Sequence, residues 1–294
     1  MKKRLLKIMI YFVLCGFAFV FLYPFLYAFV TSFKSYNDIN NMLIKWIPQE
    51  FTPSNWKLAF DALKVDKSFL NSVLVTGLAT IGHLFSCSLV AYGFARFEFR
   101  GKKILFGIVL LSIIVPIQTI IVPIYMIFGK IEWVGTYLPL IVPTFLGMGL
   151  NGGLFIFLFH QYFIKIPPSL EEAAALDGCN EFSTFFRIVL PTSKSTTLVC
   201  FILSVVWHWN DFFEPGIYIT SGEDYLMPQM LPSLYELFQS ITQASSGEAI
   251  NLALQYHEGV VMAATMLCVI PLLIIFFIFQ RQFMQGIERT GMVE

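Results

Sequence analysis

The sequence predicts an all-α membrane protein with six transmembrane helices. Hydrophobic residues make up 57% of the chain and charged residues 13%, whereas soluble domains carry roughly 25% charged residues. Most side chains are therefore expected to lie away from water. Continuous apolar runs, each long enough for the ~20 residues of one bilayer span, cover residues 8–33, 69–94, 104–128, 138–163, 196–219 and 260–280. Because the runs are continuous and do not alternate with polar residues, they favour helices over barrel strands.

The first run is expected to stay in the protein as a membrane span. It is much longer than the ~7–15 apolar residues of a signal peptide, and no small-residue cleavage site closes it. We therefore expect residues 1–68 to form an N-terminal span followed by an extracytoplasmic segment. Residues 69–294 are expected to form a five-helix core, whose cytoplasmic loop lies at 165–191.

The distribution of basic residues predicts that both termini lie in the cytoplasm. Most of the 19 Lys and Arg residues fall in the segments 2–7, 96–103, 165–194 and 281–289. The long segment 221–258 on the other side contains none. Since cytoplasmic loops are enriched in Lys and Arg, this pattern gives an N-in, C-in chain with an even number of spans.

The sequence offers no catalytic, cofactor-binding or metal-binding motif. It lacks the phosphate-binding loop GxxxxGK[ST], HExxH and GxSxG, and its five cysteines have no ligand spacing. A formal net charge of zero gives no reason to expect a nucleic-acid partner. We therefore expect neither an enzyme nor a chain that hydrolyses ATP itself.

The loop after the fourth run predicts two short helices joined by a turn. Pro167-Pro168 ends the span, and Ser169 with Glu172 three residues later has the spacing of a capping box that would start the first helix. Gly178 is placed to end this helix in a left-handed conformation. Asn180 can then cap a second helix that runs to Pro191. The alanines between the caps leave a thin helix surface that another chain can approach closely.

This loop resembles the EAA motif of permease subunits in binding-protein-dependent ABC importers. The motif consists of Glu-Ala-Ala, three residues, Gly, nine residues, Ile, any residue, Leu and Pro. The chain has Glu172-Ala173-Ala174, Gly178, Ile188 and Leu190-Pro191 at those spacings. The resemblance extends over nearly the whole chain and implies the type I ABC importer permease fold in the bacterial cytoplasmic membrane.

The resemblance also implies partners. They are a sister permease chain, two ABC ATPase subunits that carry the ATP and Mg²⁺, an extracytoplasmic solute-binding protein and membrane lipid. The residues expected to dock onto an ATPase are Glu171, Glu172, Ala173, Ala174, Asp177 and Gly178. Glu172 is expected to meet basic residues of the ATPase.

Two further stretches are similar to the carbohydrate branch of this family, which includes the smaller membrane subunit of the maltose transporter. One is the Trp-Asn-Asp-Phe stretch 209–212, and the other is the C-terminal tail from Gln280. Glu214 departs from the branch, where an apolar or aromatic residue is expected. Near this stretch, indoles could stack on a sugar ring and polar groups could bind its hydroxyls, or the same residues could lie at the membrane interface. The candidate pathway residues are Trp207, Trp209, Asn210, Asp211 and Glu214.

Three other functions compete with a sugar importer. The first is an ABC importer permease for a non-sugar solute. The second is a secondary transporter, although the two halves of the chain show no convincing repeat of the kind such proteins usually contain. The third is a membrane-embedded enzyme, which no nucleophile–base or metal cluster supports.

Overall fold

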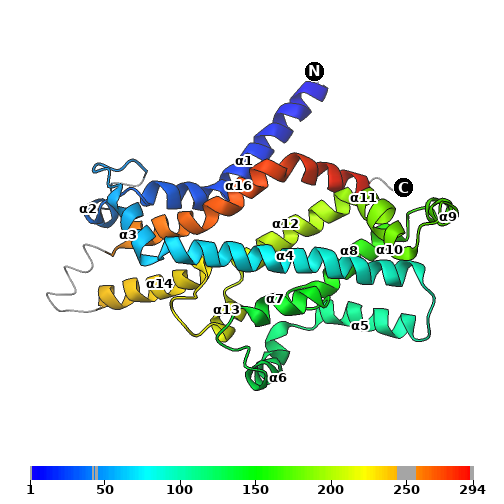
Figure 1. The fold of residues 1–294 in the computed structure, drawn as a ribbon. Coiled ribbons are helices and arrows are strands. Elements are labelled where there is room, and N and C mark those ends of the chain that lie inside the picture. Colours follow the sequence, from blue (N-terminus) through cyan, green and yellow to red (C-terminus); the bar gives the residue numbers. More distant parts are fainter. Residues whose placement is uncertain (1, 42, 44–45, 244–255, 292–294) are drawn as a thin grey trace. The chain divides into compact units, whose positions relative to one another are not determined.

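The computed structural model describes residues 2–41, 43, 46–243 and 256–291, and its regular elements in these ranges are helices. The β pairing within them is an isolated antiparallel bridge between Lys34 and Phe51. The predicted all-α fold is therefore confirmed (Figure 1). The helices are α1 (Lys2–Thr31), α2 (Tyr36–Asn40), α3 (Ser54–Ala62), α4 (Val65–Arg96), α5 (Lys102–Ile114), α6 (Ile117–Lys130), α7 (Leu138–Phe145), α8 (Gly152–Phe163), α9 (Ser169–Leu176), α10 (Glu181–Thr184), the π-helix η1 (Phe185–Val189), α11 (Leu190–Thr192), α12 (Lys194–Asn210), α13 (Phe213–Tyr218), α14 (Met227–Gln243) and α16 (Glu258–Gly291).

Three of the six expected spans form single helices that are long and apolar enough to cross a membrane. They are Arg4–Thr31, Val65–Arg96 and Glu258–Gln282. Two bent helix pairs raise the number of candidate spans to as many as 5 among the described residues. The count of six and the N-in, C-in orientation stay predictions.

The third expected span is not one helix, so this part of the prediction was wrong. It consists of α5 and α6, which are bent by 106° relative to each other. The break falls at Val115-Pro116, where Val115 adopts an extended conformation with ψ 116°. Proline has no N–H to donate and disfavours helical backbone in the residue before it, which explains the position of the bend.

The fourth and fifth expected spans are also interrupted. Between α7 and α8, three residues take left-handed backbone conformations: Gly147 (φ 73°), Gly149 (φ 86°) and Asn151 (φ 60°). The fifth run stops at Asn210, where the backbone of Asp211 is extended, and resumes as α13. Hydropathy averages over such breaks, so the runs read as continuous although the backbone is not.

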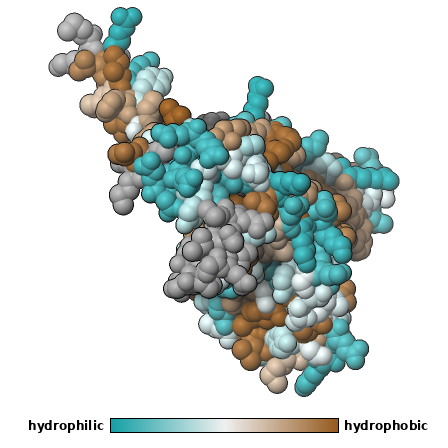
Figure 2. Space-filling view, turned by 90° about the vertical axis from the view of Figure 1, so that its left-hand side faces the viewer, coloured by the Kyte–Doolittle hydropathy of each residue, from teal (hydrophilic) through white to brown (hydrophobic). Residues whose placement is uncertain are grey.

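Large apolar side chains are exposed along α1. Phe12 is 79% exposed and Phe21 is 72% exposed. Figure 2 shows hydrophobic residues (brown) at the surface beside hydrophilic ones (teal). Such a surface suits a helix whose solvent is lipid, because exposed apolar area costs nothing there.

The chain divides into two compact units, Met1–Val65 with Met230–Pro271, and Asp66–Gln229 with Leu272–Glu294. In the first unit, the Asn55 amide donates to the backbone carbonyls of Ser32 (3.0 Å) and Lys34 (2.9 Å), which ties α3 to the end of α1. Tyr27 of α1 donates to Glu258 at the start of α16 (3.1 Å).

The second unit has an aromatic core that joins α4, α8 and the loop helices. Phe155, Phe159 and Phe163 lie on one face of α8 and pack with Tyr92 and Phe185. Further members of this buried cluster are Cys87, Ala91, Phe94, Ile156, Ile166, Val189 and Cys200. The cluster thus places η1 against the end of α4, and Figure 1 shows α9, α10 and α11 grouped there.

The close approach of α5 and α8 depends on Gly153, which gives a first test of the packing. A Cβ at Gly153 would collide with Ser112 Oγ and would lie 2.8 Å from the Val109 backbone carbonyl, which cannot move aside. Gly153→Ala is expected to destabilise the protein by about 1–3 kcal/mol, as overpacked cores are. The measurement is thermal unfolding of the purified protein in mild detergent.

The matched control is Gly107→Ala in α5, where a Cβ meets no described atom within 4 Å. Because alanine favours helix over glycine by about 0.5–1 kcal/mol, this variant should be neutral or slightly stabilised. Equal unfolding temperatures for the two variants would show that Gly153 does not set the distance between the helices.

Candidate functional site

The first helix of the loop, α9, begins without the expected capping box. Its N-cap residue is Pro168, and no side chain caps it. The Pro168 carbonyl instead accepts hydrogen bonds from the backbone of Glu171 (2.9 Å) and Glu172 (3.0 Å). Ser169 is therefore already helical, and the predicted capping by Ser169 was wrong. The two glutamates still lie in the first turn, where negative charge suits the helix dipole.

The end of α9 is a Schellman motif, which confirms the predicted role of Gly178. Gly178 has φ +84°. Its N–H donates to the Ala175 carbonyl (3.0 Å), and the N–H of Cys179 donates to the Ala174 carbonyl (2.9 Å). This double pattern satisfies carbonyls that the helix end would leave free. The chain therefore turns sharply after α9 at a residue that must be left-handed.

The second helix of the loop starts as predicted at Asn180. The Asn180 side chain accepts a hydrogen bond from the Ser183 N–H at 2.8 Å. The helix then widens into η1, in which the N–H of Leu190 donates to the carbonyl of Phe185, five residues earlier. Pro191 follows directly and supplies no N–H, which explains why the regular bonding pattern is disturbed before it. The helical turn continues to Thr192, just past the predicted end.

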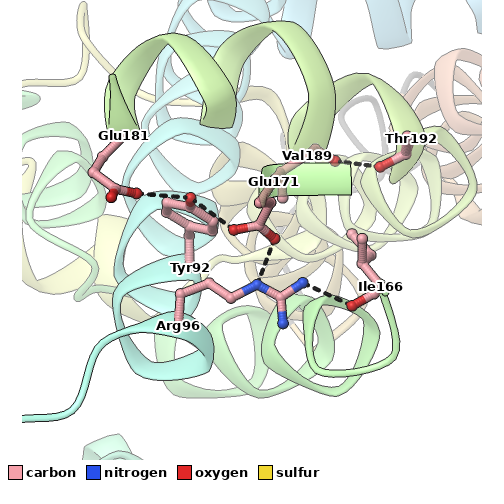
Figure 3. A network of polar contacts seen from close by, with 7 residues as sticks. All are labelled: Tyr92, Arg96, Ile166, Glu171, Glu181, Val189 and Thr192. Atoms are coloured by element: carbon pink, nitrogen blue, oxygen red, sulfur yellow. Dashed lines mark hydrogen bonds and ion pairs between the residues drawn. The ribbon is translucent and has the colours of Figure 1, made fainter. Parts of the chain in front are cut away.

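A polar network attaches the loop to the end of α4, as Figure 3 shows. Arg96 Nε donates to Glu171 Oε1 at 2.5 Å, and Arg96 Nη2 donates to the Ile166 carbonyl at 2.9 Å. The Tyr92 hydroxyl lies 3.2 Å from Glu171 Oε2 and 3.4 Å from Glu181 Oε2. The sequence analysis did not predict this network. Arg96 and Tyr92 lie far from Glu171 in the sequence, with the helices α5 to α8 between them.

The six residues expected to dock onto an ATPase fall on two faces of α9 and its turn. Glu171 is turned toward Arg96 and Tyr92, and Ala174 is buried. Exposed on the other side are Glu172, Ala173, Asp177 and Gly178.

Two apolar side chains near the turn after α9 are also exposed. Leu176 is 91% exposed at the end of α9, and Phe182 is 66% exposed at the start of α10. Apolar groups so open to solvent and so near one another in sequence are typical of a surface that another protein covers. Neither residue belongs to the EAA motif, so the sequence analysis did not select them. The signal that could have found them is two large apolar residues close to Gly178 in a loop.

The five candidate pathway residues do not gather on one open face. Trp209 is buried and packs edge-to-face on Phe69 with ring centroids 5.8 Å apart, and Trp207 lies against Phe155 at 5.5 Å. The Asn210 side chain is exposed and donates to the carbonyl of Val206 in its own helix (2.9 Å).

The two acids of this stretch lie where α13 begins. Asp211 Oδ1 accepts from the N–H groups of Phe213 (3.0 Å) and Glu214 (3.3 Å), so Asp211, one residue before the N-cap Phe212, stabilises the start of α13. Glu214 is buried in the first turn of that helix. These two hydrogen bonds are a structural reason for an acid at position 211, independent of any ligand.

A buried histidine pair between α4 and α12 is a second feature that sequence reasoning did not find. His83 Nε2 lies 3.0 Å from the Met148 carbonyl, and His83 Nδ1 lies 3.2 Å from His208 Nε2. Nearby, Ser204 donates to Thr80 Oγ1 at 3.1 Å. Polar groups inside a membrane bundle commonly pair with one another in this way. The pair thus joins two helices and the turn before α8.

The sequence matches a known family and known transport proteins. The profile of the family described as "Binding-protein-dependent transport system inner membrane component" matches residues 84–289. The probable ABC transporter permease protein YurM of Bacillus subtilis is 32% identical over 266 residues, covering 90% of this chain and 81% of that protein. The arabinooligosaccharides transport system permease protein AraQ of Halalkalibacterium halodurans is 25% identical over 99% of both chains.

A solved structure shares the fold. It is a chain of a bacterial ABC transporter involved in the import of the acidic polysaccharide alginate, with a TM-score of 0.79 and 21% identity, covering 96% of this chain and 98% of that one. The family profile covers well over half of the present chain and includes the whole loop from Ser169 to Thr192. The chain therefore belongs to the inner membrane components of binding-protein-dependent transport systems and is a multi-pass ABC transporter permease subunit.

Proposed function

We propose that this permease imports a sugar or oligosaccharide and is driven by a separate ATPase that docks on α9. The observation that carries the coupling is the exposed side of the loop, with Glu172 and Ala173 on α9 and Leu176 at its end. The names of similar proteins support the substrate class. One is named as an arabinooligosaccharides transport permease, and another belongs to a transporter involved in alginate import.

The exposed side of the loop has the chemistry of a docking surface. Glu172 and Asp177 give it negative charge, which a basic groove would complement. Ala173 lets a partner approach the helix backbone, and Leu176 and Phe182 offer apolar area to bury. Since aromatic and apolar anchors at the centre of an interface dominate affinity, these two side chains are the proposed anchors.

The assembly we propose contains a sister permease, two ATPase subunits and a solute-binding protein on the opposite side of the membrane. ATP and Mg²⁺ are bound by the ATPase subunits. ATP shifts the population of transporter states because it binds one state of the ATPase pair better than the other. A pathway along residues 207–214 stays a prediction, and substitution of the exposed Asn210 is the most direct way to test it.

Affinity purification of the tagged chain from its native membranes tests the docking surface. The wild type should retain an ABC ATPase and a second permease. Glu172→Lys should lose the ATPase at least tenfold and keep the second permease, because it reverses one charge at the centre of the surface; breaking a charged contact at an interface costs roughly 2–5 kcal/mol. Glu98→Lys, an equal charge change at a side chain outside the loop, is the control and should retain both partners.

Two results would contradict this function. A folded wild-type chain that retains no ATPase would favour a secondary transporter. The second is an intact importer that takes up an amino acid or an inorganic ion and does not take up any oligosaccharide delivered by its binding protein. This result would leave the ABC mechanism standing and would refute the sugar substrate.

A further inference from the structure

The loop is anchored to a helix far away in the sequence. Arg96 at the end of α4 and Glu171 at the start of α9 are 75 positions apart, yet their side chains form an ion pair whose members are only 15% and 16% exposed. Glu172, the next residue, is exposed. The two adjacent glutamates of the motif region thus have different surroundings, one within the chain and one outside.

We propose that Arg96 and Glu171 are positioning residues, whose ion pair fixes α9 to α4 so that the two helices move as one body when the ATPase moves the loop. The proposal rests on the proposed function, because it assigns the path by which motion of a docked ATPase enters the membrane helices. In this proposal Glu171 attaches α9 to α4, and Glu172 on the exposed side of α9 contacts the ATPase.

The geometry of Arg96 is what a rigid joint requires. Its Nε donates to the carboxylate of Glu171 and its Nη2 donates to the carbonyl of Ile166, so one planar guanidinium holds both the approach to α9 and its first turn. Two donors in a fixed plane define an orientation, which a single flexible ammonium group cannot do. The partial burial of both side chains also protects the pair from screening by salt.

Tyr92 lies one turn before Arg96 on α4 and joins the second helix of the loop to the same place. Its hydroxyl has one proton and two carboxylate acceptors in reach, Glu171 and Glu181. The hydroxyl can donate to one of them at a time, and it lies within reach of Glu181 at the start of α10 (3.4 Å) as well as of Glu171 (3.2 Å). Both helices of the loop are therefore tied to α4 through side chains on one face of its last turns.

The helix α4 can carry a displacement to its other end. It has 32 residues, about 48 Å at 1.5 Å per residue, and contains no proline. Near its start, Ser72 accepts a hydrogen bond from the backbone of Met227 (2.8 Å), and Asn71 donates to the carbonyls of Glu223 and Tyr225. A shift imposed on Arg96 thus reaches the segment 223–227 through one continuous helix.

The experiment uses the complete transporter, purified with its partners and reconstituted in lipid vesicles, and measures substrate uptake per ATP hydrolysed. Glu171→Gln and Arg96→Met should each retain the ATPase and lower this ratio about tenfold, since each removes one partner of a largely buried charged contact. The double variant should lose no more than either single one, because both act on the same contact. Glu98→Gln, which breaks the exposed pair with Lys102, is the control and should leave the ratio unchanged.

The outcomes separate this proposal from the proposed function. If the wild type retains its ATPase and both single variants keep the wild-type ratio, the positioning role is refuted while the importer stands. Losses that multiply in the double variant would also refute it, because the two residues would then act independently. A purely structural role would lower the yield of assembled transporter and leave uptake per ATP unchanged. If the wild type retains no ATPase, the proposed function itself fails.

Discussion

Replacing His83 by leucine is expected to lower the free energy of unfolding by about 1–3 kcal/mol, because it leaves the buried Nε2 of His208 without its partner and also removes the part-buried bond to the Met148 carbonyl. His83 is 1% exposed. A carbonyl can only accept, so the proton of the neutral His83 ring lies on Nε2, which faces Met148. Nδ1 of His83 is then the acceptor, and Nε2 of His208 donates to it. Leucine at position 83 removes both contacts at once.

Chemical or thermal unfolding in detergent measures the effect, and His160→Leu is its matched control. His160 also lies in an apolar helix, and its Nδ1 is buried without a hydrogen-bond partner among the described residues. That substitution should be neutral or stabilising, since it deletes an unsatisfied atom. In the double variant of His83 and His208, the two losses should not add, because both remove the same bond. A His83→Leu protein as stable as the His160→Leu protein would refute the proposed pairing.

Local patterns in the sequence predicted the loop helices well, since caps depend on residues only a few positions apart. Gly178 and Asn180 take the predicted roles because a left-handed cap and an amide cap are satisfied within four or five residues. The capping box at Ser169 was wrong because two adjacent prolines already supply the turn and the accepting carbonyl. The docking role that the family resemblance implies for this loop stays a prediction.

Contacts across the bundle could not be predicted in this way. In the sequence, Arg96 is one of several basic residues that follow the second apolar run. Nothing near it in the sequence indicates a contact with Glu171. Similarly, His83 and His208 are 125 positions apart, and neither lies in a motif. Hydropathy identified the apolar runs but not their breaks at Pro116 and Asp211, because the average over ~20 residues does not register a single backbone turn.

The second large effect is expected at Gly178, where valine should reduce substrate uptake by about tenfold while the membrane helices stay folded. An L-residue in the left-handed region costs about 1–2 kcal/mol, and a β-branched residue is a stronger outlier there. A Cβ at Gly178 meets no described atom within 4 Å, so the cost is in the backbone and not in packing. The Schellman bonds would open, and α9 would lose the direction in which it presents Glu172.

Gly178→Asn separates backbone conformation from every other property of this position. Asparagine also adds a side chain, but it tolerates the left-handed region and is the second most common residue at such caps. It should therefore keep most of the uptake and most of the bound ATPase, whereas valine should lose both although the purified chain stays folded and monodisperse. If asparagine is as damaging as valine, the glycine is needed because a partner's surface lies against it, and the exposed turn at Gly178 would itself belong to the docking surface.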